Sequence, residues 1–343
     1  MPPKPKKGGK KKDNADDPGY LAMRAFKKAY DVANQQHETE ALSLNLEPGE
    51  GHSCIAKLIL TPQTVGVNTH CPLAPAHAKP LCIALSNYPF MRRLCFWGVD
   101  LKDEGAQPVA AYVQLHRKLR VLELTDCNLG PAACKYLGEA LGDHNPGQEL
   151  IMLRLDHNRS IGNAGVAALI PRTGGSLCVK DLGLSFCGIE GVAGGTALAE
   201  GLMRKPMLTH LRIRGNALGT EGVIQVLNGV KTSTSLFHLD LSDSSTSIET
   251  ELMKHLLETL ELCTWLHEYY LIGNPMGDSV AYTLLRSMRH LAHVIQFEVS
   301  DGIDPLLYKQ IGDMMTAHRK EWVKKNKKKK KGKKGKAKGK AKK

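Results

Sequence analysis

Leu-Arg-Val-Leu-Glu-Leu-Thr-Asp-Cys-Asn-Leu, residues 119–129, and Leu-Thr-His-Leu-Arg-Ile-Arg-Gly-Asn-Ala-Leu, residues 208–218, are two copies of one eleven-residue phrase. Both copies place apolar residues at positions one, four, six and eleven, and a cysteine or an asparagine at position nine. The phrase recurs at intervals of 28 to 31 residues, with starts at Met91, Leu119, Leu150, Val179, Leu208, Leu236, Leu266 and, in degenerate form, Val294. Repetition this regular predicts one structural unit stacked many times along the chain.

Each unit changes its hydrophobic period halfway along. Residues 119–124 alternate at period two, which predicts a short strand, whereas Ala133, Leu137, Ala140 and Leu141 share one face of a helix. A single unit cannot bury its apolar face, but stacked units bury a continuous core. We therefore predict an α/β solenoid of about eight to nine repeats, with a parallel β-sheet on its concave face and helices on its convex face.

Position nine is occupied by Cys127, Asn158, Cys187 and Asn216 in successive units. A small polar side chain turned inward there can hydrogen-bond backbone groups of neighbouring turns that would otherwise be buried and unpaired. Together with the phrase L-x-x-L-x-L-x-x-(N/C)-x-L and the unit length, this alternation resembles the ribonuclease-inhibitor class of leucine-rich repeat proteins. The resemblance covers residues 91–301 and, weakly, residues 55–65.

Two units depart from the phrase, and we expect local distortion in both. One extra residue places Ile161 where position eleven should fall at residue 160, and Ser244 replaces the asparagine or cysteine in a loop rich in serine and threonine.

The resembled class includes ribonuclease inhibitors, Ran GTPase-activating proteins, sensor domains of intracellular immune receptors and leucine-rich subunits of ciliary axonemes. The resemblance therefore implies a non-covalent protein-binding surface without a cofactor. A Ran GTPase-activating type of regulator is one alternative that it raises. Those proteins carry an acidic C-terminal segment, however, where this chain carries polylysine.

The chain divides into five predicted segments. Asp17 and Pro18 supply an N-cap and a first-turn proline for a helix near the start, and two short alternating stretches, 42–46 and 55–60, begin the sheet. A second amphipathic helix begins at Pro305 and would cap the last strand. The predicted segments are a disordered lysine-rich arm at 1–18, a capping helix and first strand at 19–54, the repeat domain at 55–304, a capping helix at 305–323 and a disordered polylysine tail at 324–343.

The positive charge is concentrated at the two ends of the chain. Residues 1–12 contain six lysines and residues 324–343 contain fourteen, so these twenty exceed the whole net charge of +13 and leave residues 13–323 at −7. Such runs attract polyanions through a salt-sensitive field. The predicted polyanion-binding residues are Lys324, Lys325, Lys327, Lys328, Lys329, Lys330, Lys331, Lys333 and Lys334. A solvated solubility tail and a nuclear-import signal are the alternative interpretations.

Several functional classes lack their sequence signals. The nine cysteines are scattered without a disulfide framework, and no apolar stretch approaches the ~20 residues of a membrane span. The residues His70, Cys71 and His77 lack paired zinc-ligand spacing, so no metal site is predicted. Phosphate-binding loops, nucleophile elbows and zinc-protease motifs are also missing, and we expect no catalytic residues and no enzymatic activity.

The concave face is the predicted binding surface. Alternate strand residues point away from the core, so positions three, five, seven and eight of the phrase should face a partner. Aromatic and arginine residues dominate interface energetics. The predicted contacts are Trp97, Arg154, Phe186, Arg212, Arg214 and Tyr270.

These observations predict a non-catalytic scaffold for protein partners, monomeric within a larger complex, whose basic tails tether it to an acidic polymer. A reduced, intracellular location is expected because no secretory signal opens the chain. The favoured setting is cytoplasmic and cytoskeletal, on tubulin or on axonemal subunits of a cilium or flagellum. The alternative is a nuclear, nucleolar or ribosome-associated adaptor whose tails bind RNA or DNA.

Overall fold

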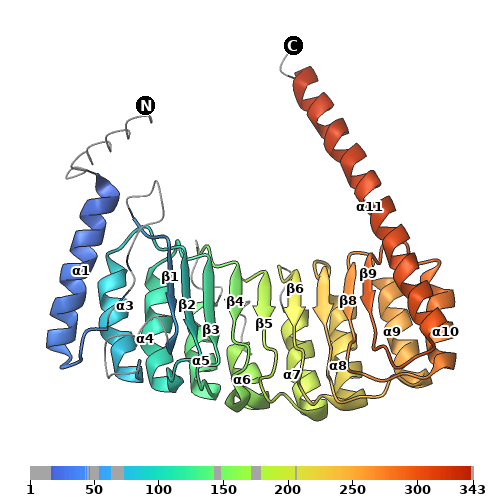
Figure 1. Cartoon of the computed structure of the whole chain (residues 1–343), viewed down its shortest axis with the longest axis horizontal. Coiled ribbons are helices and arrows are strands. Elements are labelled where there is room, and N and C mark those ends of the chain that lie inside the picture. The colour runs from blue at the N-terminus through green and yellow to red at the C-terminus, as the bar shows by residue number, and fades with distance from the viewer. Residues whose placement is uncertain are drawn as a thin grey trace, which may run out of the picture.

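The computed structural model describes residues 17–42, 44, 46, 54–62, 73–142, 148–170, 179–204 and 207–340. Within this part, nine strands form one open sheet in chain order, and every neighbouring pair is parallel (Figure 1). The strands are β1 (Lys57–Leu60), β2 (Arg93–Trp97), β3 (Val121–Thr125), β4 (Met152–Arg154), β5 (Asp181–Gly183), β6 (His210–Arg212), β7 (His238–Asp240), β8 (Glu268–Tyr270) and β9 (Gln296–Glu298). Each of the eight phrases supplies one strand, which confirms the predicted solenoid.

The helices lie on one side of the sheet, the convex side, and leave the opposite, concave face uncovered by them except near α11 (Figure 1). They are α1 (Pro18–Gln36), α3 (Ala78–Ser86), α4 (Lys102–Leu115), α5 (Pro131–Ala140), α6 (Gly162–Leu169), α7 (Gly191–Met203), α8 (Gly219–Thr232), α9 (Thr250–Leu262), α10 (Asp278–Met288) and α11 (Pro305–Lys340). Two short 3-10 helices, η1 (Pro75–His77) and η2 (Arg159–Ile161), lie between them. Consecutive helices pack side by side, so one continuous hydrophobic core runs between the sheet and the helices.

The strand register follows the phrase position by position. Position five of each unit pairs with position five of the next, from Cys95 through Arg154 and Arg212 to Glu298. The apolar residues at positions four and six, such as Leu122 and Leu124, are fully buried. A parallel sheet in this register stacks like positions into straight rows about 4.8 Å apart.

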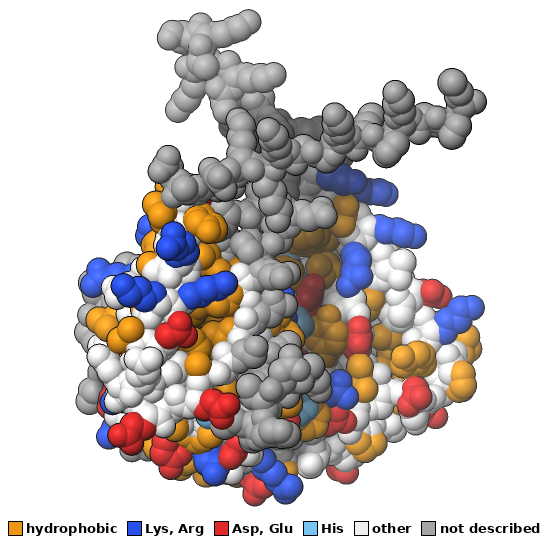
Figure 2. Space-filling model, turned by 60° about the vertical axis from the view of Figure 1, so that its left-hand side comes forward, with side chains coloured by type: hydrophobic (Ala, Val, Ile, Leu, Met, Phe, Trp, Pro, Cys, Tyr) orange, Lys and Arg blue, Asp and Glu red, His pale blue; other side chains and the backbone are white. Residues whose placement is uncertain are grey.

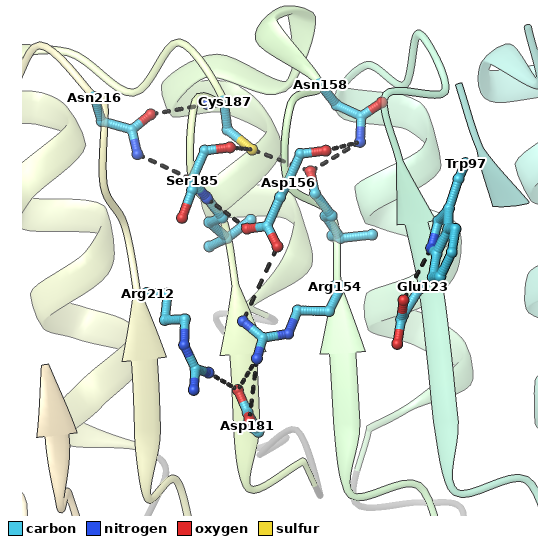
Figure 3. A network of polar contacts seen from close by, with 12 residues as sticks. Trp97, Glu123, Arg154, Asp156, Asn158, Asp181, Ser185, Cys187, Arg212 and Asn216 are labelled. Carbon is cyan, nitrogen blue, oxygen red and sulfur yellow. Dashed lines mark hydrogen bonds and ion pairs between the residues drawn. The ribbon is translucent and has the colours of Figure 1, made fainter. Parts of the chain in front are cut away.

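Asparagines at position nine join neighbouring repeats, as predicted (Figure 3). Asn216 Oδ1 accepts hydrogen bonds from the backbone N–H groups of Cys187 and Ile189 at 3.0 and 3.1 Å, and its Nδ2 donates to Leu184 and Ile213 carbonyls. Asn158 repeats this pattern with Cys127, Leu129, Leu124 and Leu155. The thiols of Cys127 and Cys187 donate to carbonyls of the preceding units. These side chains pair backbone groups that the stacked turns bury.

The two irregular units are distorted locally, again as predicted. The extra residue in the third phrase is absorbed by η2, and this short helix returns Ile161 to a fully buried position. In the sixth phrase, Ser244 donates only to the Leu241 carbonyl of its own turn, at 2.6 Å. Asn274 then accepts from one backbone N–H, that of Ser244, instead of two. The polar network between repeats is therefore thinner at the C-terminal end.

Helix α1 covers the first edge of the domain. Asp17 is its N-cap and accepts from the backbone N–H groups of Gly19 and Tyr20, and Phe26 and Tyr30 lie in the core. This confirms the predicted first helix. The predicted strand over 42–46 is not formed at the described residues 42, 44 and 46, and its other residues lie outside the described part.

Helix α11 covers the other end, packing against α10 and β9, with His318 Nδ1 2.9 Å from the Val294 carbonyl oxygen. The sequence predicts a helix that stops at residue 323 and a disordered tail from residue 324. The structure differs, because α11 continues unbroken to Lys340 and projects beyond the sheet (Figure 1). Lysine has a high helix propensity, and packed turns supply the nucleus from which a helix extends.

Candidate functional site

The concave face of the sheet, formed by phrase positions three, five, seven and eight, brings the predicted contacts into one surface. Trp97, Arg154, Arg212 and Tyr270 lie on β2, β4, β6 and β8, while Phe186 and Arg214 lie in the turns that follow β5 and β6. Figure 2 shows that acidic, basic and hydrophobic side chains are intermingled on the side of the molecule that it presents. The six residues differ in how freely they could meet a partner.

Arg154 and Arg212 share one carboxylate on the strand between them (Figure 3). Asp181 Oδ1 lies 3.2 Å from Arg154 Nη2 and 2.5 Å from Arg212 Nη1. A second carboxylate, Asp156, lies 4.0 Å from Arg154 Nη1 and accepts from the backbone N–H of Ser185. All four charged side chains are less than a third exposed. We define Arg154, Asp156, Asp181 and Arg212 as the ion-pair cluster.

Burial is the main influence on the pKa values of Arg154 and Asp156. Desolvation lowers the pKa of Arg154, and the nearby carboxylate of Asp181 opposes this effect. Desolvation also raises the pKa of Asp156, against the hydrogen bond from Ser185. The cluster is therefore a rigid, internally compensated patch, and its arginines are fixed in place before any partner arrives.

Trp97 is anchored in the same way near the N-terminal end. Its Nε1 donates to Glu123 Oε2 at 2.9 Å, and Arg93 also pairs with this carboxylate. Glu123 is only 7% exposed. The indole ring is thus held at the concave surface by its polar edge, a geometry suited to contact with a partner.

Phe186 is the aromatic side chain that stands most exposed on this face, 39% accessible. Its ring stacks on His157 with centroids 4.7 Å apart and an angle of 15° between the planes. In the next turn, a Cβ on Gly215 would fall 2.2 Å from the Phe186 ring, and Gly215 also has a φ of +70°. The glycine therefore leaves room for Phe186. Arg214 pairs with Asp243 at 2.8 Å, and 44% of its side chain stays exposed.

Tyr270 belongs to a group of rings that the sequence reasoning missed. His238 lies 4.8 Å from the Tyr270 centroid, stacks on His210 at 5.4 Å and places its Nδ1 2.9 Å from Glu268 Oε2. Burial raises the pKa of Tyr270 to about 12 and lowers the pKa of His210. The available signal was position three of the phrase, where histidine occurs in two successive units.

The basic residues predicted to bind polyanions lie on α11. Lys324, Lys325 and Lys327 are exposed along it. The side chains of Lys328, Lys329, Lys330, Lys331, Lys333 and Lys334, and the N-terminal lysines, lie outside the described residues.

One buried thiol, that of Cys95, lies on β2. Burial raises the pKa of the Cys95 thiol to about 11, so it is not an activated nucleophile. Within the described ranges, no three histidine, cysteine or acidic side chains gather in a way that could hold a metal ion. Across those ranges, no helix is both long and apolar enough to cross a bilayer.

Comparisons with known proteins agree with this architecture. A family model described as Leucine Rich repeat matches residues 116–138 and 204–226. The chain is 28% identical over 223 residues to NACHT, LRR and PYD domains-containing protein 12 of Mus musculus, which aligns 64% of this chain with 20% of that protein. It is 27% identical over 224 residues to ribonuclease inhibitor of Sus scrofa, which aligns 64% of this chain with 47% of the inhibitor.

Among solved structures, an internalin from Listeria monocytogenes aligns with 12% sequence identity over 85% of this chain and 94% of that chain, with a TM-score of 0.38. The chain spans between a fifth and a half of the length of the curated relatives named above. The phrase, the in-register parallel strands and the asparagines between repeats, together with the family-model match and the similarity to ribonuclease inhibitor, identify a leucine-rich repeat protein that is similar to ribonuclease inhibitors.

Proposed function

We propose that this protein is a non-catalytic scaffold that binds partner proteins on its concave face and is tethered to an acidic assembly by its lysine-rich ends. The leucine-rich repeat fold supports an interaction scaffold in general. The observation that carries the proposal is the fixed arrangement of Trp97, the ion-pair cluster, Phe186 and Tyr270 along one sheet surface. Contacts held in place before binding lose little conformational freedom when a partner docks.

The acidic assembly that we propose is the microtubule surface, most specifically that of a ciliary or flagellar axoneme. The twenty lysines at the two ends of the chain supply a cationic field, and the glutamate-rich tails of tubulin have the opposite sign. Helix α11 carries the C-terminal lysines away from the sheet, which leaves the concave face accessible (Figure 1). The tether would therefore be separate from the contacts Trp97, Arg154 and Phe186.

Co-sedimentation with microtubules tests the tether. The full chain should pellet with intact microtubules, release as salt rises, and pellet much less after the tubulin tails are removed by protease. A variant with glutamine at Lys324, Lys325, Lys327, Lys328, Lys329, Lys330, Lys331, Lys333 and Lys334 should fold normally and lose most of the binding. Equal pelleting with tail-free microtubules, or displacement by RNA at fixed salt with no preference for microtubules, would contradict the cytoskeletal assignment.

A further inference from the structure

A groove lies between α11, the strand β9 and the turn that follows β8. Its volume is about 940 Å³. One wall is made by Ile272, the strand β9 and Val299, and the other by a single stripe of α11 that runs from Tyr308 to Lys327. The α11 stripe comprises Tyr308, Ile311, Gly312, Met315, Thr316, Arg319, Lys320, Val323, Lys324 and Lys327.

The helix is fixed over this groove at two points. His318 lies 2.9 Å from the Val294 carbonyl oxygen, and the Trp322 ring packs edge-on against Phe237 and His267, with centroids 6.5 and 6.0 Å apart. The guanidinium of Arg319 is close enough to act electrostatically on Tyr270. The groove is therefore a continuation of the concave face, closed on one side by α11.

The floor of the groove is apolar. Phe297, Val299, Ile311 and Met315 form its buried base. Above them, Ile272, Tyr308 and Val323 are between 36% and 47% exposed, although these are large hydrophobic side chains. Apolar surface in a concave site is stabilised when a partner removes it from water.

The rim of the groove is basic. Arg319, Lys320, Lys324 and Lys327 line it against one carboxylate, that of Glu298, which accepts from Gln296. Lys325 lies outside the groove and is paired with Glu321 at 3.9 Å. The groove thus combines an apolar floor with an excess of positive charge along the helix.

We propose that this groove binds an acidic linear segment of a partner protein that carries large apolar side chains. The inference rests on the proposed scaffold function and names the chemistry of one partner. The four cations attract carboxylates, and the floor accepts the apolar side chains. The stripe is about 28 Å long at 1.5 Å per helical residue, which matches ~8 residues of extended chain. The lysine-rich arm of this chain has the wrong charge to occupy it.

Gly312 gives a direct way to close the groove. It lines the groove in the middle of the helical stripe, and a Cβ built on it would meet nothing within 4 Å. Replacing glycine inside a helix with alanine favours the helix, because glycine loses more backbone freedom on folding. Gly312→Trp should therefore fill the groove without harming the fold, and Gly312→Ala is the matched control that leaves it open.

The test is fluorescence anisotropy on the full chain with two labelled peptides. One has the sequence Glu-Glu-Phe-Glu-Glu-Phe-Glu-Glu, and the other has serine in place of both phenylalanines. The phenylalanine peptide should bind wild type at least about tenfold more tightly, because two rings leave water. Gly312→Trp should abolish that difference and Gly312→Ala should preserve it.

Lys320→Glu with Lys324→Glu should weaken binding at least about tenfold. Lys309→Glu with Lys254→Glu, which lie outside the groove, should change it little.

Equal affinity for the two peptides, unchanged by Gly312→Trp, would overturn the groove and show that charge alone attracts acidic chains. Self-association of wild type that Gly312→Trp disrupts, without peptide binding, would also overturn it and assign the groove to a second copy of this chain. Either result would leave the concave-face scaffold standing, because that proposal depends on Trp97, Arg154 and Phe186, which do not line the groove.

Discussion

The central repeats and the C-terminal end of the solenoid are built from the same phrase, yet they differ in how far their polar groups are satisfied internally. In the centre, Asn158 and Asn216 each accept from two backbone N–H groups, and Asp181 neutralises arginines on both neighbouring strands. At the C-terminal end, Asn274 accepts from one such group, and the cations of α11 face an open groove. The central repeats therefore satisfy their own polar groups, whereas the C-terminal end leaves cations available to a partner.

The largest effect should come from breaking the asparagine contacts. Asn216→Ala leaves two buried N–H groups and two carbonyls without their partner, and should lower the free energy of unfolding by about 3 kcal/mol. Ser244→Ala removes one hydrogen bond within its own turn and should cost about 1 kcal/mol. Urea denaturation followed by circular dichroism measures both. Equal losses of unfolding free energy would mean that hydrogen bonds between repeats stabilise the two regions to the same extent.

The ion-pair cluster gives the next effect. Asp181→Ala removes the carboxylate that pairs with two partly buried arginines. This change should lower the free energy of unfolding by about 2 kcal/mol. Asp243→Ala removes a pair with Arg214 in which both side chains are more than a third exposed, and should cost less than about 1 kcal/mol. Thermal melts at 0.05 and 0.5 M salt separate the two, because screening acts mainly on the exposed pair.

The close approach of Gly215 to Phe186 can be tested by a double-mutant cycle. Gly215→Ala should destabilise the fold by about 2 kcal/mol, from the positive φ and from the clash with the ring. Phe186→Ala should cost about 1 kcal/mol through the lost stack on His157. The double variant should be more stable than the sum of the single losses predicts, because removing the ring relieves the clash. Strict additivity would show that the ring and the glycine do not interact.

The smallest effect is a pH dependence of stability that comes from His210, one of the rings grouped with His238 and Tyr270. Burial lowers the pKa of His210 below its ordinary value of 6.5, so the folded state favours the neutral ring. Stability from this group is present above pH 6.5 and is lost as the pH falls below it, because the unfolded chain then binds the proton more strongly. His210→Phe should therefore show a shallower loss of unfolding free energy than wild type between pH 7.5 and 5.5. An identical slope would contradict the burial of that ring.

The sequence predicted the features that depend on periodicity. Because the phrase sets which side chains face inward, the amino-acid pattern alone was enough to place the row from Cys95 to Glu298 and the inward turn of Asn158 and Cys187. The predicted helix end at residue 323 is wrong because repulsion among the lysines does not stop a helix that the packed turns of α11 begin.

The ion pairs between side chains of the concave face could not be predicted from periodicity. Arg154 and Arg212 are predicted as partner contacts, but the sequence does not reveal that both bind Asp181, which stands at position three of the phrase between theirs. The arginines are at position five and Asp181 is at position three, so the ion pairs run diagonally across the sheet and a comparison of like positions does not show them. The groove was missed for a different reason, since it depends on the angle at which α11 crosses β9, and no repeat position encodes that angle.

The most direct test is a quantitative comparison of the proteins that copurify from cells with three forms of the full chain. These forms are the wild type, a concave variant and a convex variant matched in the number of substitutions. The concave variant carries alanine at Trp97, Arg154, Phe186, Arg212, Arg214 and Tyr270. The convex variant carries alanine at the exposed helix residues Leu21, Val32, Leu115, Val192, Leu262 and Tyr282. With folding checked by circular dichroism, the concave variant should lose the wild-type partners and the convex variant should keep them. The reverse pattern would contradict a binding role for the concave face.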